Sequence, residues 1–289
     1  MRAALRRVLP TSTAPPEARV VAEEAQWDRY VHDQQARLQT ALRAHIPPLI
    51  LSGPMAHVLH LAVLALVLRL RARMVPFVGD ILAYQRPDAK QLITEELQAA
   101  LMRLAARLPR DEPDARGGDG NAPGRLPAGR QGGRPGLTVI GHSLGTVIAS
   151  DFLWDARQQP GAFQLLNFFT LGSPMAFYAL RYGSGRIEEF DKPLAIAAPG
   201  CWVNCYHPAD PVATPLRRLN PAYQRAVLHD AEIRNAALFT AHTSYWKDSK
   251  VHEVIGEKLA LDWLERRSAL PPERLAALRR HYEDHLSLI

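Results

Sequence analysis

Short apolar runs and longer segments of helical periodicity alternate through the second half of the chain. The runs that predict buried strands are apolar, partly β-branched or aromatic, and bounded by turn residues: residues 137–140, 164–171 and 201–206. The segments that predict helices repeat apolar residues at helical spacing: residues 88–108, 249–267 and 273–288. Together these elements predict an α/β fold, in which a mostly parallel sheet is flanked by helices.

The N-terminal quarter of the chain has a different pattern. Residues 18–45 have the spacing of a helix, and residues 49–68 are almost continuously apolar. The second stretch contains a Ser-Gly-Pro turn and two histidines, interruptions that a membrane-spanning helix normally lacks. Three interpretations stay open for it: a buried helix, a lid beside an acyl pocket whose terminal arginines rest on phospholipid, or a membrane-embedded segment. We predict a helical N-terminal or lid region over 1–75 and a core over 76–289.

A compositional break precedes the first predicted strand. Residues 117–136 hold eight of the eighteen glycines in the chain, together with prolines and arginines. Such a composition cannot bury a hydrophobic core, so residues 111–136 are predicted to form a mobile surface loop. Because this loop connects a helix to the start of a strand, we expect it to lie away from the active site and to have little catalytic role.

The pentapeptide Gly141-His142-Ser143-Leu144-Gly145 carries most of the functional information. It has the pattern G-x-S-x-G, with a predicted strand before it and a segment that can begin a helix after it. This strand, turn and helix context is typical of a serine nucleophile raised on a sharp turn. Glycine permits the close backbone approach, and N–H groups at the helix N-terminus face developing negative charge. A chance match in a loop is the alternative, and the flanking elements disfavour it.

A serine nucleophile needs a general base and an acid that orients it. In the α/β-hydrolase fold the order along the chain is serine, acid, histidine. Asp210 follows the third predicted strand, at the carboxyl edge where ligands bind in open α/β sheets, and His242 lies on a loop before the helix of 249–267. We therefore predict that Asp210 is the acid and His242 the base.

Other residues compete for these two roles. His229 is the main alternative for the base, since the remaining downstream histidines fall on predicted helices. Asp191 and Asp230 are alternatives for the acid, although neither follows so clear a strand. An Asp-Pro pair such as that at Asp210 is often only a turn, so its position between Ser143 and His242 is what favours it.

Four segments in this order, Gly-His-Ser-Leu-Gly-Thr, Leu-Gly-Ser-Pro, Asp-Pro-Val-Ala and His-Thr-Ser-Tyr-Trp, resemble bacterial lipase/esterase-type α/β-hydrolases over residues 76–265. The resemblance implies a carboxylic-ester hydrolase without metal or organic cofactor. It implies Ser143, Asp210 and His242 as the catalytic triad, with the backbone N–H of Leu144 in the oxyanion hole. Such enzymes usually take a second oxyanion donor from an early loop marked by His-Gly, which this chain lacks. Either the chain is shortened at its N-terminus, or another loop supplies that donor.

Composition narrows the list of partners and compartments. The 289 residues carry a net charge of +6 and are 47% hydrophobic, as in a soluble globular protein. The basic residues are scattered and form no nucleic-acid module, so a nucleic-acid partner is not expected. Cys201 and Cys205 would lie about 13 Å apart along one strand, too far for a disulfide. With no apolar signal segment at the N-terminus, this predicts a cytoplasmic protein, with peripheral membrane contact as an alternative.

The predicted function is therefore hydrolysis of carboxylic esters through an acyl-enzyme, with short- to medium-chain acyl groups favoured and a small-molecule or lipid ester as substrate. Two alternatives stay open. One is a membrane-associated lipase or phospholipase, for which residues 49–68 would be a lid. The other is a non-catalytic binding protein with a hydrolase fold, which the missing donor loop favours.

Overall fold

The computed structural model describes residues 21–26, 84, 86–107, 135–156, 163–181, 194, 196, 199–234, 240–266 and 270–289. Three features of the sequence lie outside the described residues: the apolar stretch over 49–68 with its three open interpretations, the domain boundary at residue 75, and the glycine-rich stretch up to residue 134. The described part of the chain belongs to two compact units, one within residues 21–109 and one within residues 110–289. Each is considered by itself.

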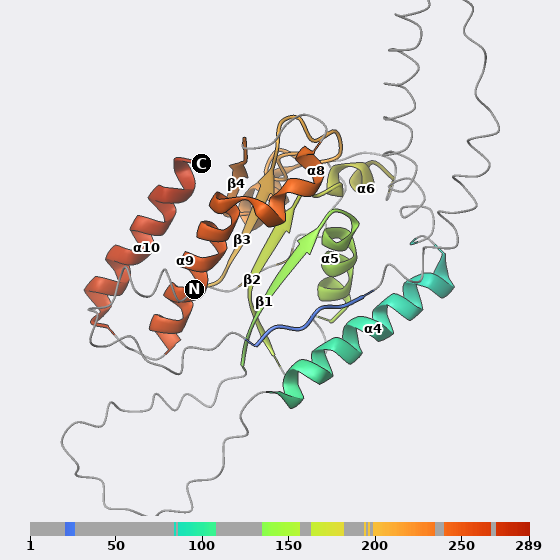
Figure 1. Ribbon diagram of the computed structural model, residues 1–289, viewed down its shortest axis with the longest axis horizontal. Helices are drawn as coiled ribbons and strands as arrows, with labels where there is room; N and C mark the ends of the chain where they lie inside the picture. The colour runs from blue at the N-terminus through green and yellow to red at the C-terminus, as the bar shows by residue number, and fades with distance from the viewer. Residues whose placement is uncertain are drawn as a thin grey trace, which may run out of the picture. The chain divides into compact units, whose positions relative to one another are not determined.

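The larger unit is built on a parallel sheet of four strands in the order β1-β2-β3-β4 (Figure 1). The strands are β1 (Gly136–His142), β2 (Gln164–Leu171), β3 (Cys201–Tyr206) and β4 (His229–Glu232). The three predicted strands are confirmed. His142 pairs with Leu171, which in turn pairs with Cys205. The carboxyl ends of β1, β2 and β3 therefore meet at one edge of the sheet.

Strand β4 was not predicted, because His229–Glu232 reads His-Asp-Ala-Glu and has no apolar pattern. It joins the sheet through parallel backbone pairing with β3. Within β4 only Ala231 is buried, and Ile233 directly after it is buried as well. Backbone hydrogen bonds and these two side chains are sufficient to place a strand that is otherwise polar.

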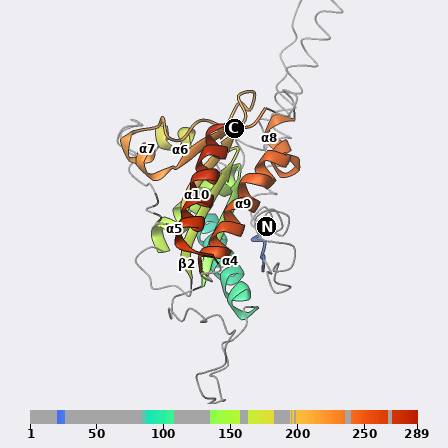
Figure 2. The ribbon, with the colours of Figure 1, turned by 90° about the vertical axis from the view of Figure 1, so that its left-hand side faces the viewer.

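Helices cover both faces of the sheet, so the fold belongs to the α/β class. They are α5 (Leu144–Ala156), α6 (Met175–Arg181), α7 (Pro221–Ala226), α8 (Ala241–Ser244), the 3-10 helix η3 (Tyr245–Lys247), α9 (Ser249–Arg266) and α10 (Pro272–Ser287). Figures 1 and 2 show α9 and α10 side by side. The helices predicted over 249–267 and 273–288 are confirmed as α9 and α10, with bounds that differ by one residue. Among the described helices we find no candidate for a membrane span, either by length or by hydropathy.

The alternation of side chains along the strands separates two hydrophobic clusters. Phe169 and Val203 point to the cluster that contains residues of α9 and α10. Their neighbours Phe168 and Trp202 belong to the cluster that contains residues of α5, α6 and α7, and the two rings lie 5.1 Å apart between centroids. Because successive residues of a strand face opposite sides, a mainly apolar strand such as β2 contributes side chains to both clusters.

The smaller unit contains α4 (Pro87–Ala106), which confirms the helix predicted over 88–108. Two sequence expectations are wrong here. Residues 21–26 are not helical. In this segment Arg107 donates to the Ala22 carbonyl and to the Glu23 carboxylate. Leu92, which the apolar spacing would bury, is 43% exposed, whereas its neighbour Ile93 is buried.

Candidate active site

Ser143 occupies the turn between β1 and α5 in a left-handed conformation, with φ of +53°. That region is unfavourable for a residue with a side chain. The turn is held from two sides. The Ser143 N–H donates to the Leu171 carbonyl of β2 at 2.9 Å, and the Ser143 carbonyl accepts from the N–H of Thr146 at 3.0 Å and from its hydroxyl at 2.8 Å. The neighbouring strand and the first turn of α5 thus stabilise the strained position.

Gly141 explains why the turn can be so tight. A Cβ atom at this position would lie 2.8 Å from the Cα of Thr146 and 3.0 Å from its nitrogen. Both are backbone atoms that cannot rotate away, so only glycine fits. Ser173 lies behind the same turn, where its hydroxyl contacts that of Thr146 at 2.7 Å and accepts from the Met175 N–H at 3.3 Å. These contacts give Ser173 a structural role in the turn.

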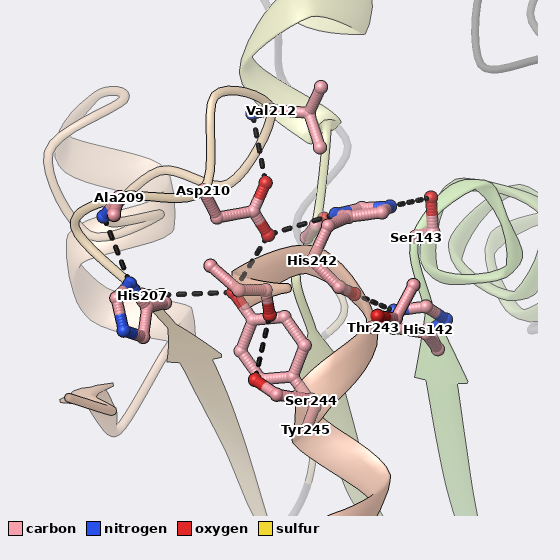
Figure 3. A network of polar contacts seen from close by, with 12 residues as sticks. His142, Ser143, His207, Ala209, Asp210, Val212, His242, Thr243, Ser244 and Tyr245 are labelled. Atoms are coloured by element: carbon pink, nitrogen blue, oxygen red, sulfur yellow. Dashed lines mark hydrogen bonds and ion pairs between the residues drawn. The ribbon is translucent and has the colours of Figure 1, made fainter. Parts of the chain in front are cut away.

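The structure brings Ser143, His242 and Asp210 into one hydrogen-bonded series (Figure 3). The Ser143 hydroxyl lies 2.8 Å from Nε2 of His242, and Nδ1 of His242 lies 2.9 Å from Oδ2 of Asp210. A carboxylate can only accept, so Nδ1 carries the proton of the neutral imidazole and Nε2 accepts from the serine hydroxyl. This is the arrangement in which a histidine can remove a hydroxyl proton.

Asp210 is held as a buried carboxylate, with its side chain out of contact with solvent. Burial by itself would raise its pKa, but the hydrogen bond and charge of His242 outweigh that effect, together with bonds from the Val212 N–H and the Tyr245 hydroxyl. The net pKa lies below its usual value. Asp210 is therefore negatively charged at neutral pH and can orient and stabilise the imidazole.

His142, the residue before Ser143, contacts His242 directly. Its Nε2 donates to the His242 carbonyl at 2.7 Å, and the two rings lie 5.1 Å apart between centroids. Burial lowers the pKa of His142, which keeps the ring neutral near pH 7. On its outer side His142 approaches the ring of Trp246 at 6.2 Å edge-on, and Trp246 is 49% exposed.

Leu144 is the first residue of α5, and its side chain is buried. No acceptor for the Leu144 N–H exists among the described residues, as is usual for the first N–H of a helix. That N–H is available to a ligand beside Ser143. The described residues do not assign a second oxyanion donor, and none of their His, Cys, Asp and Glu side chains form a group of three or more that could hold a metal ion.

The competing residues have other positions. Asp230 accepts from the backbone N–H groups of Leu216 and Arg217 at 2.8 and 3.0 Å, and from the Asn204 amide at 2.8 Å. It therefore anchors the loop that follows Asp210. His229 begins β4 and pairs with Val203, within the sheet rather than at its carboxyl edge. Asp191 lies outside the described residues.

Two residues at the site were missed by reasoning from sequence, His142 and Tyr245. His142 occupies a variable position of the G-x-S-x-G pattern, which gives no indication that it touches His242. Tyr245 follows His242 by three residues, a spacing that places two side chains on the same side of a helical turn. That spacing was the available signal for Tyr245.

Comparison with known proteins gives one partial similarity. No protein-family model matches the chain, and no solved structure matches it. A stretch of 99 residues is 31% identical to a Saccharomyces cerevisiae protein named as a probable phospholipase of mitochondria. The match covers 32% of this chain and 13% of that relative, so the chain corresponds to a small part of the relative's length.

Proposed function

We propose that the protein is a serine hydrolase of the α/β-hydrolase type that cleaves carboxylic esters through an acyl-enzyme. The observation that carries this proposal is the hydrogen-bonded series from Ser143 through His242 to Asp210, at the carboxyl edge of the parallel sheet. The strained turn that presents Ser143 supports it independently, because a cost in backbone energy is typical of functional positions.

In the proposed reaction His242 removes the Ser143 proton through Nε2 as the hydroxyl oxygen attacks the ester carbonyl carbon. The Leu144 N–H donates to the oxyanion of the tetrahedral intermediate. His242 then donates its new proton to the departing alcohol, and the acyl group stays on Ser143. A water molecule, deprotonated by His242, then attacks the acyl carbon. The bond between that carbon and the Ser143 oxygen breaks, the acid leaves, and His242 returns the proton to the serine oxygen. Throughout, Asp210 holds the imidazole and stabilises its cationic form.

Two observations favour phospholipid over a small ester as the substrate class. The partial relative is named as a phospholipase, and the chain carries a net charge of +6, which favours an anionic surface. Short- to medium-chain esters remain the first candidate from sequence. The cytoplasmic location, the peripheral membrane contact and the lid over residues 49–68 stay predictions.

A fluorophosphonate probe tests the proposal, because it forms a bond with an activated serine. We expect one label per chain on Ser143, loss of labelling and of p-nitrophenyl ester hydrolysis in Ser143→Ala, and an unchanged unfolding temperature. Ser287→Ala, which alters an exposed serine on α10, is the matched control and should label normally. Absence of label on the folded wild-type protein would instead favour the non-catalytic binding protein.

Substrate class is tested with the same preparation. Hydrolysis of p-nitrophenyl esters of increasing chain length is compared with release of fatty acid from phosphatidylcholine vesicles that contain anionic lipid. Preference for vesicles over monomeric esters of equal acyl length supports a phospholipase. Equal or better turnover of the monomeric short esters supports a carboxylesterase.

A further inference from the structure

The Tyr245 side chain contacts Asp210 from the protein interior. The residue is fully buried. Its hydroxyl lies 2.8 Å from Oδ2 of Asp210 and accepts from the His207 N–H at 2.9 Å (Figure 3). Asp210 is a carboxylate and the His207 N–H is a donor, so the direction of both bonds is determined. The single Tyr245 proton is directed at Asp210.

The oxygen that Tyr245 contacts is the one that holds the base. Oδ2 of Asp210 accepts from Nδ1 of His242 at 2.9 Å as well as from Tyr245, whereas Oδ1 accepts from the Val212 N–H at 3.1 Å. Two donors therefore share the negative charge of one oxygen. Each makes that oxygen a weaker acceptor for the other, because a hydrogen bond to the charged form of a carboxylate stabilises it.

Three segments of the chain position the Tyr245 hydroxyl against Asp210. Tyr245 begins η3 directly after the short helix that carries His242. His207 belongs to the loop after β3, and its carbonyl also accepts from the Asp210 N–H at 2.9 Å. Gly172, after β2, leaves space for the ring, because a Cβ there would lie 2.7 Å from Cε2 of Tyr245. The two hydrogen bonds of the hydroxyl and the close approach of the ring to Gly172 hold the hydroxyl against Asp210.

Tyr245 remains a neutral donor over the accessible pH range. Burial raises its pKa, and the negative charge of Asp210 raises it further. The other titratable side chains that face Asp210, His242 or Tyr245 from the described elements are His142 at the end of β1, His207 after β3 and Cys205 on β3. Burial lowers the pKa of His142 and raises that of Cys205 to about 12. These two side chains are therefore uncharged near pH 7.

We propose that Tyr245 is a positioning residue of this site. Its hydroxyl holds the Asp210 carboxylate in the orientation that accepts from Nδ1 of His242, and it limits how strongly that carboxylate stabilises the imidazolium form of His242. The inference rests on the proposed serine hydrolase function. Its consequence is that His242 is available as an unprotonated base at lower pH than it would be beside an Asp210 without this donor. Tyr245 touches neither the substrate nor the reacting atoms in this role.

Tyr245→Phe removes the hydroxyl and keeps the ring. With one donor fewer, Oδ2 of Asp210 pulls more strongly on the Nδ1 proton of His242 and stabilises the imidazolium. The acid limb of the kcat/KM profile should then move to higher pH by about half a pH unit or more. kcat should fall about tenfold, with KM unchanged, because a hydrogen bond to a charged group is lost.

Tyr282→Phe is the matched control. Tyr282 is buried in the same hydrophobic cluster as Tyr245, and within the described part of the chain its hydroxyl makes no hydrogen bond to Asp210 or His242. This variant should keep the wild-type pH profile. Titration of active sites with the fluorophosphonate probe normalises kcat to folded protein. An acid limb that stays in place in Tyr245→Phe, or that moves to lower pH, overturns the proposal.

A second measurement does not require turnover. The proton resonance of Nδ1 of His242, assigned by its loss in His242→Gln, reports the strength of the bond to Asp210. It should move downfield in Tyr245→Phe and upfield when 3,5-difluorotyrosine, a stronger donor, replaces the tyrosine at position 245. If Tyr245→Phe does not fold, the difluorotyrosine protein still decides. An unchanged resonance contradicts the role of Tyr245, whereas absence of fluorophosphonate labelling contradicts the hydrolase function alone.

Discussion

Replacing Gly172 by alanine tests how rigidly the sheet edge supports the site. Gly172 follows β2 with φ of +59°, and its N–H donates to the Cys205 carbonyl at 2.9 Å. An added Cβ would lie 2.7 Å from Cε2 of Tyr245 and 3.2 Å from Oδ2 of Asp210. Alanine at this position would therefore have to adopt a left-handed conformation, and its methyl group would overlap the side chains of Tyr245 and Asp210.

The expected loss of stability is the sum of two costs. A left-handed conformation costs an alanine about 1 kcal/mol, and forcing a methyl group against a fully buried ring costs about 2 kcal/mol. The total of about 3 kcal/mol corresponds to a Tm lower by about 10 °C. The ring relieves the overlap by moving, and its hydroxyl moves Asp210 with it. A displacement of about 1 Å at a reacting group costs roughly 100-fold in kcat/KM.

Thermal unfolding and p-nitrophenyl ester hydrolysis measure the two effects in one preparation. Gly136→Ala is the control, because a Cβ there would overlap a single side chain that is not part of the site, with Cδ1 of Leu166 at 2.3 Å and its Cγ at 3.0 Å, and Gly136 lies at the opposite end of β1 from Ser143. The control should lose less than about 1 kcal/mol and keep its activity. A Gly172→Ala protein with wild-type Tm and kcat/KM would show that Tyr245 and Asp210 can move to accommodate the methyl group, and would refute the prediction.

Two further predictions concern buried groups away from Ser143. Cys201 and Cys205 are buried and their pKa values are raised to about 12, so a thiol reagent at pH 8 should label neither in the native protein and both in urea; rapid native labelling would contradict this. Lys258 is buried, pairs with Asp262 and donates to the Pro199 carbonyl at 2.9 Å, so Lys258→Met should lower the free energy of unfolding in urea by about 3 to 5 kcal/mol. Lys258→Met combined with Asp262→Asn, which removes the charge but keeps an oxygen for the Asn167 amide that donates to Asp262 at 2.5 Å, should recover most of that loss. A double variant as unstable as the single one would exclude an unpaired carboxylate as the cause.

The parts of the fold with strong local patterns could be predicted from the sequence. Strands β1, β2 and β3 consist mainly of apolar residues, and each ends at a recognisable turn. The positions of Ser143 and Asp210 directly after their strands could therefore be predicted. The convergence of the two with His242 depends on parallel pairing, which puts the carboxyl ends of these strands at one edge. Their catalytic roles remain proposals.

What could not be predicted depends on contacts between residues far apart in the chain. Strand β4 has no apolar pattern, and Asp230 within it was considered an acid although its carboxylate binds backbone N–H groups of a loop. Residues 21–26 have helical spacing, but Arg103 and Arg107 bind Glu23 from α4 instead. Long-range ion pairs and hydrogen bonds of this kind leave no periodic trace in the sequence, since periodicity reports only which face of an element is apolar.

Left-handed backbone occurs in the described residues only at the two turns that support the site. Ser143 and Gly172 are the two described residues with positive φ, and they follow neighbouring strands of the sheet. A strained non-glycine residue costs of order 1 to 3 kcal/mol and persists only where the surroundings over-determine it. Here those surroundings are the backbone bonds from Ser143 to β2 and from Gly172 to β3, so the pairing that builds the sheet also holds the two turns. The sheet can therefore unfold only together with the site, whereas a change in either turn can disable the site while the sheet persists.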